Sequence, residues 1–290
     1  MKTLLNAYYE LTKPRIVFMV LVTATWGYFL GSSGTFWGML ADATFWATMV
    51  GTAFSAAGGA VLNQYLERDI DRTMERTRKR PLPMGIVSPI DALAYGLWLT
   101  LIGLAILLVG VNLITAFLVL LTNFLYVLVY TPMKRLSPLN TTFGAIPGAM
   151  PPLIGWTAAQ GGVTVEGVLL FLILFVWQHP HVYAIGWMYR EDYARAGFRM
   201  LSLRDDKGTL TVHGVIWGTL ALIGVSVLPV WRGMAGGAYL AVALIMGIVL
   251  LEYGRRLVRV RTVPAARAVL LATIVYLPVI LAGILIDSLL

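Results

Sequence analysis

The sequence has 290 residues, of which 59% are hydrophobic and 12% are charged. Soluble domains carry charge on about a quarter of their residues, so this composition excludes an ordinary soluble protein. The lack of cysteine excludes disulfides, thiol catalysis and thiolate metal sites. The formal net charge is +8, but the cations gather at the edges of apolar segments. There they set membrane topology and attract anionic lipid or substrate, so no nucleic-acid partner is expected.

Nine apolar segments follow one another along the chain, and each is long enough to cross about 30 Å of hydrocarbon. They predict an all-α, polytopic membrane helical bundle. The expected spans are residues 16–36, 46–66, 90–110, 113–131, 141–159, 167–188, 211–231, 236–254 and 268–287. We expect residues 1–290 to form a single membrane domain, in which spans 1–4 and 5–8 are a pseudo-repeat and the ninth span is appended.

The positive charges predict the orientation of these spans. Of the 22 Lys and Arg residues, all but Arg232 fall in the N-terminal segment or in the connections after spans 2, 4, 6 and 8. Positive charge marks the cytoplasmic side, so these segments are expected there. The first span follows Lys13 without a small-residue cleavage site, so we do not expect a cleaved signal peptide. The lack of a presequence rich in Arg and Ser favours a bacterial inner membrane.

A polar stripe ends the second span. Asn63, Glu67 and Asp71 recur every four residues, so they share one face of a helix. An amide and two carboxylates are good ligands for a hard cation such as Mg²⁺, which often brings a phosphate with it. The stripe therefore suggests metal-assisted handling of a lipid diphosphate.

A dense basic run follows the stripe and is sufficient to hold a multiply charged anion; its members are Arg72, Arg76, Arg78, Lys79 and Arg80. The alternative interpretation is a solvated helix end with incidental ion pairs, such as Asp69 with Arg72. Asp69 falls on the opposite helix face, where a structural role is expected.

The connection after span 4 carries Lys134, Arg135 and Asn140. These cations either set topology or, if they lie near the acidic stripe, bind diphosphate oxygens. Span 5 follows, and its prolines at 147, 151 and 152 are expected to interrupt the helix. Irregular backbone in a membrane lines a cavity or is packed in protein, and the interleaved glycines also permit close helix packing. Both interpretations remain open.

Span 6 contains Trp177, Gln178, His179, Pro180 and His181. Polar side chains at membrane depth are costly and usually functional. A histidine there can bind iron, transfer a proton or make a structural hydrogen bond. The two histidines should diverge on a regular helix unless Pro180 distorts it. His213, at the edge of span 7, is expected to be interfacial.

The connection over residues 189–210 again places carboxylates beside cations, including Glu191, Asp192 and Lys207. Alone it is typical of an interfacial loop. Together with the first stripe it becomes a candidate for the second half of a metal–diphosphate site.

Together these segments resemble the intramembrane UbiA-type prenyltransferase superfamily and, within it, the protohaem IX farnesyltransferase (haem O synthase) family. The resemblance covers nearly the whole chain. The matching motifs are Leu-Thr-Lys13-Pro14-Arg15, Asn63-xxx-Glu67-xxx-Asp71, Arg76-Thr77-xx-Arg80-Pro81-Leu82, Tyr130-Thr-Pro-xx-Arg135 with Asn140, Pro180-His181 and Glu191-Asp192-Tyr193-xxx-Gly197-xx-Met200-Leu201. Two departures stand out. Glu67 replaces the usual Asp, and the second motif is reduced to the adjacent pair Glu191 and Asp192.

The resemblance implies about nine helices around a central cavity. It also implies transfer of a farnesyl group from farnesyl diphosphate to a vinyl group of haem b with addition of water, giving haem O and diphosphate. Haem O serves respiratory oxidases directly or after conversion to haem A, so a haem A synthase or an oxidase-assembly protein is the expected partner. The alternatives are a quinone-type prenyltransferase acting on a hydroxybenzoate or naphthoate and, more remotely, a membrane carrier.

Residue roles follow from the resemblance as hypotheses. The expected Mg²⁺ ligands are Asn63, Glu67, Asp71 and Asp192, and the expected diphosphate-binding residues are Arg78, Arg80, Lys134, Arg135 and Lys207. The allylic cation would be stabilised by the aromatic faces of Tyr65, Trp177 or Tyr183. His181 is expected to position haem or handle the proton of the added water, with His179 as the second candidate.

Overall fold

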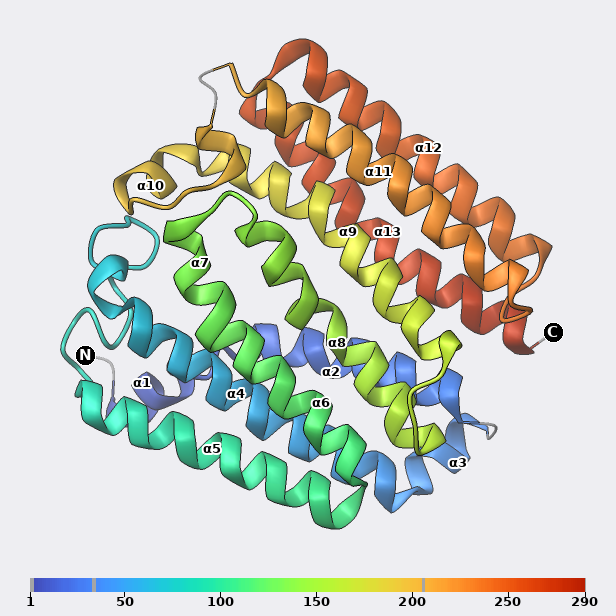
Figure 1. Ribbon diagram of the computed structural model, residues 1–290, viewed down its shortest axis with the longest axis horizontal. Coiled ribbons are helices and arrows are strands. Elements are labelled where there is room, and N and C mark those ends of the chain that lie inside the picture. The colour runs from blue at the N-terminus through green and yellow to red at the C-terminus, as the bar shows by residue number, and fades with distance from the viewer. Residues whose placement is uncertain (1–2, 33–34, 205–206, 290) are drawn as a thin grey trace. The chain divides into compact units, whose positions relative to one another are not determined.

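The computed structural model describes residues 3–32, 35–204 and 207–289, and helices are the only regular secondary structure in these ranges (Figure 1). The elements are α1 (Leu4–Leu11), α2 (Pro14–Gly31), α3 (Phe36–Ala41), α4 (Ala43–Asp71), α5 (Pro89–Gly110), α6 (Leu113–Phe124), η1 (Leu125–Tyr130), α7 (Thr131–Leu136), α8 (Asn140–Gln160), α9 (Val165–Met188), α10 (Arg190–Arg195), η2 (Leu201–Leu203), α11 (Thr209–Trp231), α12 (Gly237–Val260) and α13 (Val263–Leu289). The predicted all-α class is confirmed.

Within the described residues, 8 helices are long and apolar enough to cross a membrane. They are α2, α4, α5, α9, α11, α12, α13 and the continuous segment formed by α6, η1 and α7. The remaining predicted span, residues 141–159, lies in α8. That helix is not among the eight, although its 21 residues extend about 31 Å. The expectation of about nine spans is therefore close.

The prediction that prolines interrupt span 5 is wrong, because α8 is one continuous helix. Proline fixes φ near its helical value, and its main cost in a helix is a lost hydrogen bond and steric strain at the preceding turn. In membrane helices, neighbouring elements can satisfy the backbone groups that proline leaves without a partner.

The second half of α8 packs closely against α2. A Cβ atom added to Gly27 would overlap the carbonyl group of Pro152, and one added to Gly155 would overlap the carbonyl group of Ala24. Backbone cannot move aside as a flexible side chain can. Glycine is therefore required at both positions, which supports close packing as one role of the small residues in this span.

The chain forms two compact units. The first comprises the chain up to Met133 together with Met150–Gly167 and Arg195–Gly197. The second comprises Lys134–Ala149, Val168–Ala194 and the chain from Phe198 onward. The pseudo-repeat and the single-domain assignment stay predictions.

In the first unit, α4 packs along α2 and α5. Its 29 residues extend about 44 Å, which exceeds the roughly 30 Å of a hydrocarbon layer. The last turns of α4 can therefore reach the membrane edge while remaining part of a rigid helix, and these turns carry the polar stripe.

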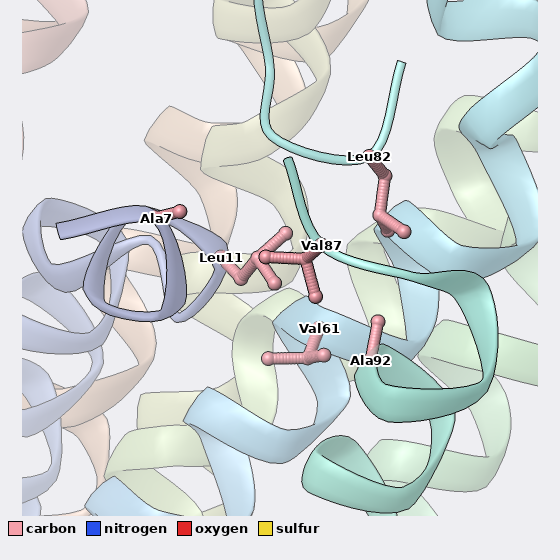
Figure 2. Packing of buried hydrophobic residues seen from close by; sticks show 6 residues of the cluster. All are labelled: Ala7, Leu11, Val61, Leu82, Val87 and Ala92. Carbon is pink, nitrogen blue, oxygen red and sulfur yellow. The ribbon is translucent and has the colours of Figure 1, made fainter. Parts of the chain in front are cut away.

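A buried apolar cluster fixes the connection between α4 and α5 to the end of α4 (Figure 2). Leu82 and Val87 of this connection lie with Leu11 of α1 and Val61 of α4. Apolar burial drives this contact, and its consequence is that Arg80, two residues before Leu82, is held beside the polar stripe.

Between α6 and α7 the chain forms a π-helix, η1. The hydroxyl of Thr131 donates to the carbonyl oxygen of Tyr126 at 2.9 Å, five residues earlier. Single-turn π-helices within α-helices are rare and occur frequently at functional sites.

In the second unit, α11 packs on α12 and α12 packs on α13. The carboxylate of Asp287, near the end of α13, accepts hydrogen bonds from the backbone N–H groups of Gly236 and Tyr239 at 2.7 and 2.8 Å. It thereby caps the start of α12. The indole Nε1 of Trp177 in α9 donates to the carbonyl oxygen of Thr273 in α13 at 2.8 Å.

Candidate active site

The three residues of the polar stripe lie on one buried face at the end of α4. Asn63, Glu67 and Asp71 are 1%, 4% and 0% exposed. Asp69 is 70% exposed and lies 3.8 Å from the guanidinium groups of Arg68 and Arg72. Asp69 thus lies on the opposite face of the helix, as expected, and makes the ion pair with Arg72 that the alternative interpretation named. Two carboxylates buried at a helix end are unlike a solvated helix terminus.

Asn63 is fixed by partners from two other segments. Its Oδ1 accepts a hydrogen bond from Nζ of Lys13 at 2.7 Å, and its Nδ2 donates to Oγ1 of Thr131 at 2.9 Å. Lys13 precedes α2 with a left-handed backbone (φ 49°). In the sequence Lys13 counts among the N-terminal positive charges that set topology, and the structure also places its charge directly on the stripe.

Only one of the two carboxylate oxygens of Asp71 has a hydrogen-bond partner in the described residues. Its Oδ2 accepts from Nη1 of Arg80 at 2.7 Å, and the hydroxyl of Thr77 donates to its backbone carbonyl at 2.9 Å. Its Oδ1 is buried and has no hydrogen-bond partner in the described part of the chain. Leaving a buried charged acceptor without a donor is costly, and a cation bound at Oδ1 would remove that cost.

The stripe can supply part of the ligand set of a Mg²⁺ ion, with substrate phosphates and waters supplying the rest. Among residues 3–32, 35–204 and 207–289, no three His, Asp or Glu side chains gather as a complete metal site. Mg²⁺ is commonly bound through one or two carboxylates together with substrate phosphates and waters. Glu67 and Asp71 supply two carboxylates, and Asn63 supplies an amide oxygen that Lys13 now contacts.

The predicted diphosphate-binding cations occupy different surroundings. Arg80 is largely buried against Asp71, whereas Arg78 is exposed and paired with Glu75. Arg135 is exposed. Lys134 lies over the ring of Phe198, with Nζ 5.7 Å from its centroid.

Two contacts fix the backbone around these cations. The carbonyl oxygen of Lys134 accepts from the backbone N–H of Arg199 at 2.7 Å, so α7 is joined to the connection after α10. Lys207 is exposed, and its carbonyl oxygen accepts from Arg261 at 2.9 Å.

Asp192 lies half-buried in α10. The loop after it turns at Gly197, whose φ is +66°, and the rings of Tyr193 and Phe198 lie 5.8 Å apart. Asp192 belongs to the second unit and the polar stripe to the first. Its share in the metal site stays a prediction.

His179 and His181 diverge as expected, and Pro180 does not break α9, which is continuous. A hydrogen bond of 3.3 Å joins His179 to Thr142 of α8, while one of 2.9 Å joins His181 to Thr273 of α13. His213 is exposed and bonded only locally to Thr209 among the described residues. It is not part of this group.

Sequence reasoning missed Thr131 and Thr273, both of which are buried partners of candidate site residues. Thr131 falls within the motif Tyr130-Thr-Pro-xx-Arg135, so the sequence did contain a signal for it. Thr273 lies in an apolar helix where threonine is unremarkable, so nothing in the sequence marks it.

Residues 20–277 match the family described as the UbiA prenyltransferase family. The chain belongs to this family. The chain is 45% identical to a protoheme IX farnesyltransferase of Solibacter usitatus (strain Ellin6076), over 97% of this chain and 98% of that protein. It is also 38% identical to protoheme IX farnesyltransferase 1 of Pseudomonas putida (strain GB-1), over 99% and 98% of the two chains.

Solved structures of membrane proteins share the fold. A digeranylgeranylglyceryl phosphate synthase superimposes with a TM-score of 0.80 at 19% identity, covering 98% of both chains. A UbiA homologue from Archaeoglobus fulgidus, bound to GPP and Mg²⁺, superimposes with a TM-score of 0.63 at 14% identity, covering 98% of this chain and 100% of that one. The fold is therefore that of a membrane prenyltransferase.

Proposed function

We propose that this chain is a protohaem IX farnesyltransferase. It transfers the farnesyl group of farnesyl diphosphate to a vinyl group of haem b. The bond between the first farnesyl carbon and the diphosphate oxygen breaks, the vinyl group forms a new carbon–carbon bond, and water adds to the resulting cation and loses a proton. The products are haem O and diphosphate.

Prenyl transfer is supported above all by the buried stripe at the end of α4, with its unpartnered Asp71 Oδ1, in a chain of the UbiA prenyltransferase family. The choice of haem as acceptor is supported by the near full-length likeness to relatives named protoheme IX farnesyltransferase.

Asn63, Glu67 and Asp71 are the residues that would hold Mg²⁺, with Asp192 as the further proposed ligand. Bound Mg²⁺ would neutralise charge on the diphosphate and so make it a better leaving group. Arg80 orients the Asp71 carboxylate through its bond to Oδ2, which leaves Oδ1 for the cation. Lys13 orients the amide of Asn63 and adds positive charge where the diphosphate binds.

The remaining cations are proposed to bind diphosphate oxygens, as Arg and Lys commonly do. They are Arg78, Arg80, Lys134, Arg135 and Lys207. Arg80 supports this role best, because its guanidinium already lies on the stripe, with further N–H groups beyond the one donated to Asp71.

The allylic group would be stabilised by an aromatic face, and the three candidates differ. Tyr65 already lies against the guanidinium of Arg68, at 4.8 Å from the ring centroid. Tyr183 lies edge-on to His179, and Trp177 stacks on His181. Trp177 and Tyr183 lie beside the two histidines of α9, of which His181 is the one expected to position haem, and this favours them over Tyr65.

The protein is integral to a membrane. We place it in a bacterial inner membrane with its N-terminus and active-site connections on the cytoplasmic side, because those segments hold nearly all the Lys and Arg residues. A haem A synthase or an oxidase-assembly protein is the proposed partner, since one of them would receive the product.

The test is product analysis by mass spectrometry of membranes containing the full chain, with haem b, farnesyl diphosphate and Mg²⁺. A haem carrying a hydroxyethylfarnesyl group, formed only with Mg²⁺, is expected. Asp71→Asn should abolish it, whereas Asp69→Asn, on the exposed face of the same helix turn, should retain it. Diphosphate release with 4-hydroxybenzoate but not with haem would instead assign the chain to a quinone-type reaction.

A further inference from the structure

The two histidines of α9 differ in which ring nitrogens are already engaged. Nδ1 of His179 lies 2.9 Å from the carbonyl oxygen of Phe175, and a carbonyl can only accept, so Nδ1 carries the proton. Nε2 of the neutral ring is then an acceptor and lies 3.3 Å from the hydroxyl of Thr142. Both nitrogens of His179 have partners, as expected for a structural histidine.

The tautomer of His181 is fixed by Thr273. The single hydroxyl proton of Thr273 is donated to the carbonyl oxygen of Leu270 at 2.6 Å. Its oxygen, 2.9 Å from Nδ1 of His181, must therefore accept, so Nδ1 of His181 carries the proton. The lone pair of the neutral ring is on Nε2, whereas the hydrogen bond of this ring within the described residues is made through Nδ1.

Thr273 also fixes the ring next to His181. Its backbone carbonyl accepts from Nε1 of Trp177 at 2.8 Å, and the Trp177 and His181 rings stack with centroids 4.6 Å apart and planes 24° apart. Thr273 is 0% exposed. One buried residue of α13 therefore sets the position of two α9 side chains and the protonation of one of them.

This arrangement is suited to binding iron. A histidine that binds a metal does so through an unprotonated ring nitrogen while its other N–H is held by a second partner, which fixes the ring. Resting on the proposed function, in which haem b is the acceptor, we propose that Nε2 of His181 binds the iron of the haem substrate and that Thr273 is the positioning residue that keeps this nitrogen unprotonated and oriented.

The test measures haem binding without turnover. Ferric haem b is titrated into the purified full-length protein in lipid nanodiscs, without farnesyl diphosphate, and its ligation is followed by absorption and electron paramagnetic resonance. We expect the spectrum of imidazole-ligated haem. His181→Gln should lose it, and imidazole added to His181→Gly should restore it. His179→Gln and the exposed control His213→Ala should keep it.

Thr273 is tested by a matched pair of substitutions. Thr273→Val has a similar shape but no acceptor, and loss of such a partner typically weakens metal binding 10- to 100-fold, so we expect a weaker affinity for haem in that range. Thr273→Ser keeps the hydroxyl and should keep both affinity and spectrum. If Thr273→Val does not fold, the serine variant and the imidazole rescue of His181→Gly decide the question.

Three results would overturn the inference. They are a wild-type spectrum without imidazole ligation, loss of that ligation in His179→Gln but not in His181→Gln, or a Thr273→Ser variant as weak as Thr273→Val. Each is independent of catalysis. A protein that binds haem through His181 but forms no farnesylated haem would instead contradict the proposed function.

Discussion

Replacing Arg80 with methionine should destabilise the protein by disrupting a buried ion pair. The guanidinium of Arg80 donates to Oδ2 of Asp71 at 2.7 Å, and the Asp71 side chain is 0% exposed. Oδ1 of Asp71 has no hydrogen-bond partner in the described residues. Removing the Arg80 guanidinium from Oδ2 therefore leaves this carboxylate without its observed side-chain donor. Methionine retains an apolar stem, so little packing is lost.

The expected magnitude follows from burial. Removing one partner of a buried ion pair costs about 3–5 kcal/mol because a buried charge is left uncompensated. Arg80 is 22% exposed, so water reaches part of the pair and the lower end, about 3 kcal/mol, is expected. The control is Arg78→Met. Arg78 and Glu75 are 52% and 64% exposed, so breaking that pair should cost about 1 kcal/mol or less.

The assay is the free energy of unfolding of the purified variants in one detergent, measured by denaturant titration. The double variant Arg80→Met/Asp71→Asn should recover stability relative to Arg80→Met, because a neutral amide costs less to bury than a carboxylate. The reasoning is refuted if Arg80→Met is no less stable than Arg78→Met, or if neutralising Asp71 recovers nothing.

Three further outcomes are expected. Gly155→Ala should lower stability by about 1–3 kcal/mol through overpacking against the α2 backbone, while Gly224→Ala, with open space around it, should be tolerated; equal melting temperatures would contradict the close packing. Chelation by EDTA should stop product formation and added Mg²⁺ should restore it, as liquid chromatography can measure; activity that persists in EDTA would remove the proposed role of Asp71. The hydroxyl of Tyr28 and the backbone N–H of Thr44 hold the pKa of Asp42 below its usual value of 3.8, so this contribution to stability is present above that value and is lost as the pH falls through the lowered pKa. Tyr28→Phe should therefore flatten the acid limb of the stability curve, and an unchanged limb would argue against the bond.

The sequence was sufficient for the spans and for the main stripe, for identifiable physical reasons. Apolar runs in a membrane protein must be helical because the backbone has no water to bond with. The four-residue spacing of Asn63, Glu67 and Asp71 then puts them on one face. The expectation that prolines interrupt the helix of span 5 was wrong. Proline breaks a helix in water more readily than a helix packed within a membrane, where neighbouring elements satisfy the freed backbone groups.

Partners far apart in sequence could not be predicted. Lys13 contacts Asn63 across 50 positions, and His181 contacts Thr273 across 92. Periodicity concerns only residues on the same helix, so it cannot show which threonine of another helix lies opposite. It likewise could not separate Arg80, held on Asp71, from Arg78, paired on the surface with Glu75.

The conformation of the π-helix η1 decides which residue faces Asn63. A π turn contains one residue more than an α turn. If Leu125–Tyr130 kept all its residues but became α-helical, Thr131 would rotate by about 100° around the axis, away from the amide of Asn63 from which it now accepts a hydrogen bond. Deleting one residue while the segment becomes α-helical would instead leave Thr131 near its present position, because the π turn absorbs one residue. The surroundings of Asn63 thus depend on the backbone conformation of this segment as well as on its side chains.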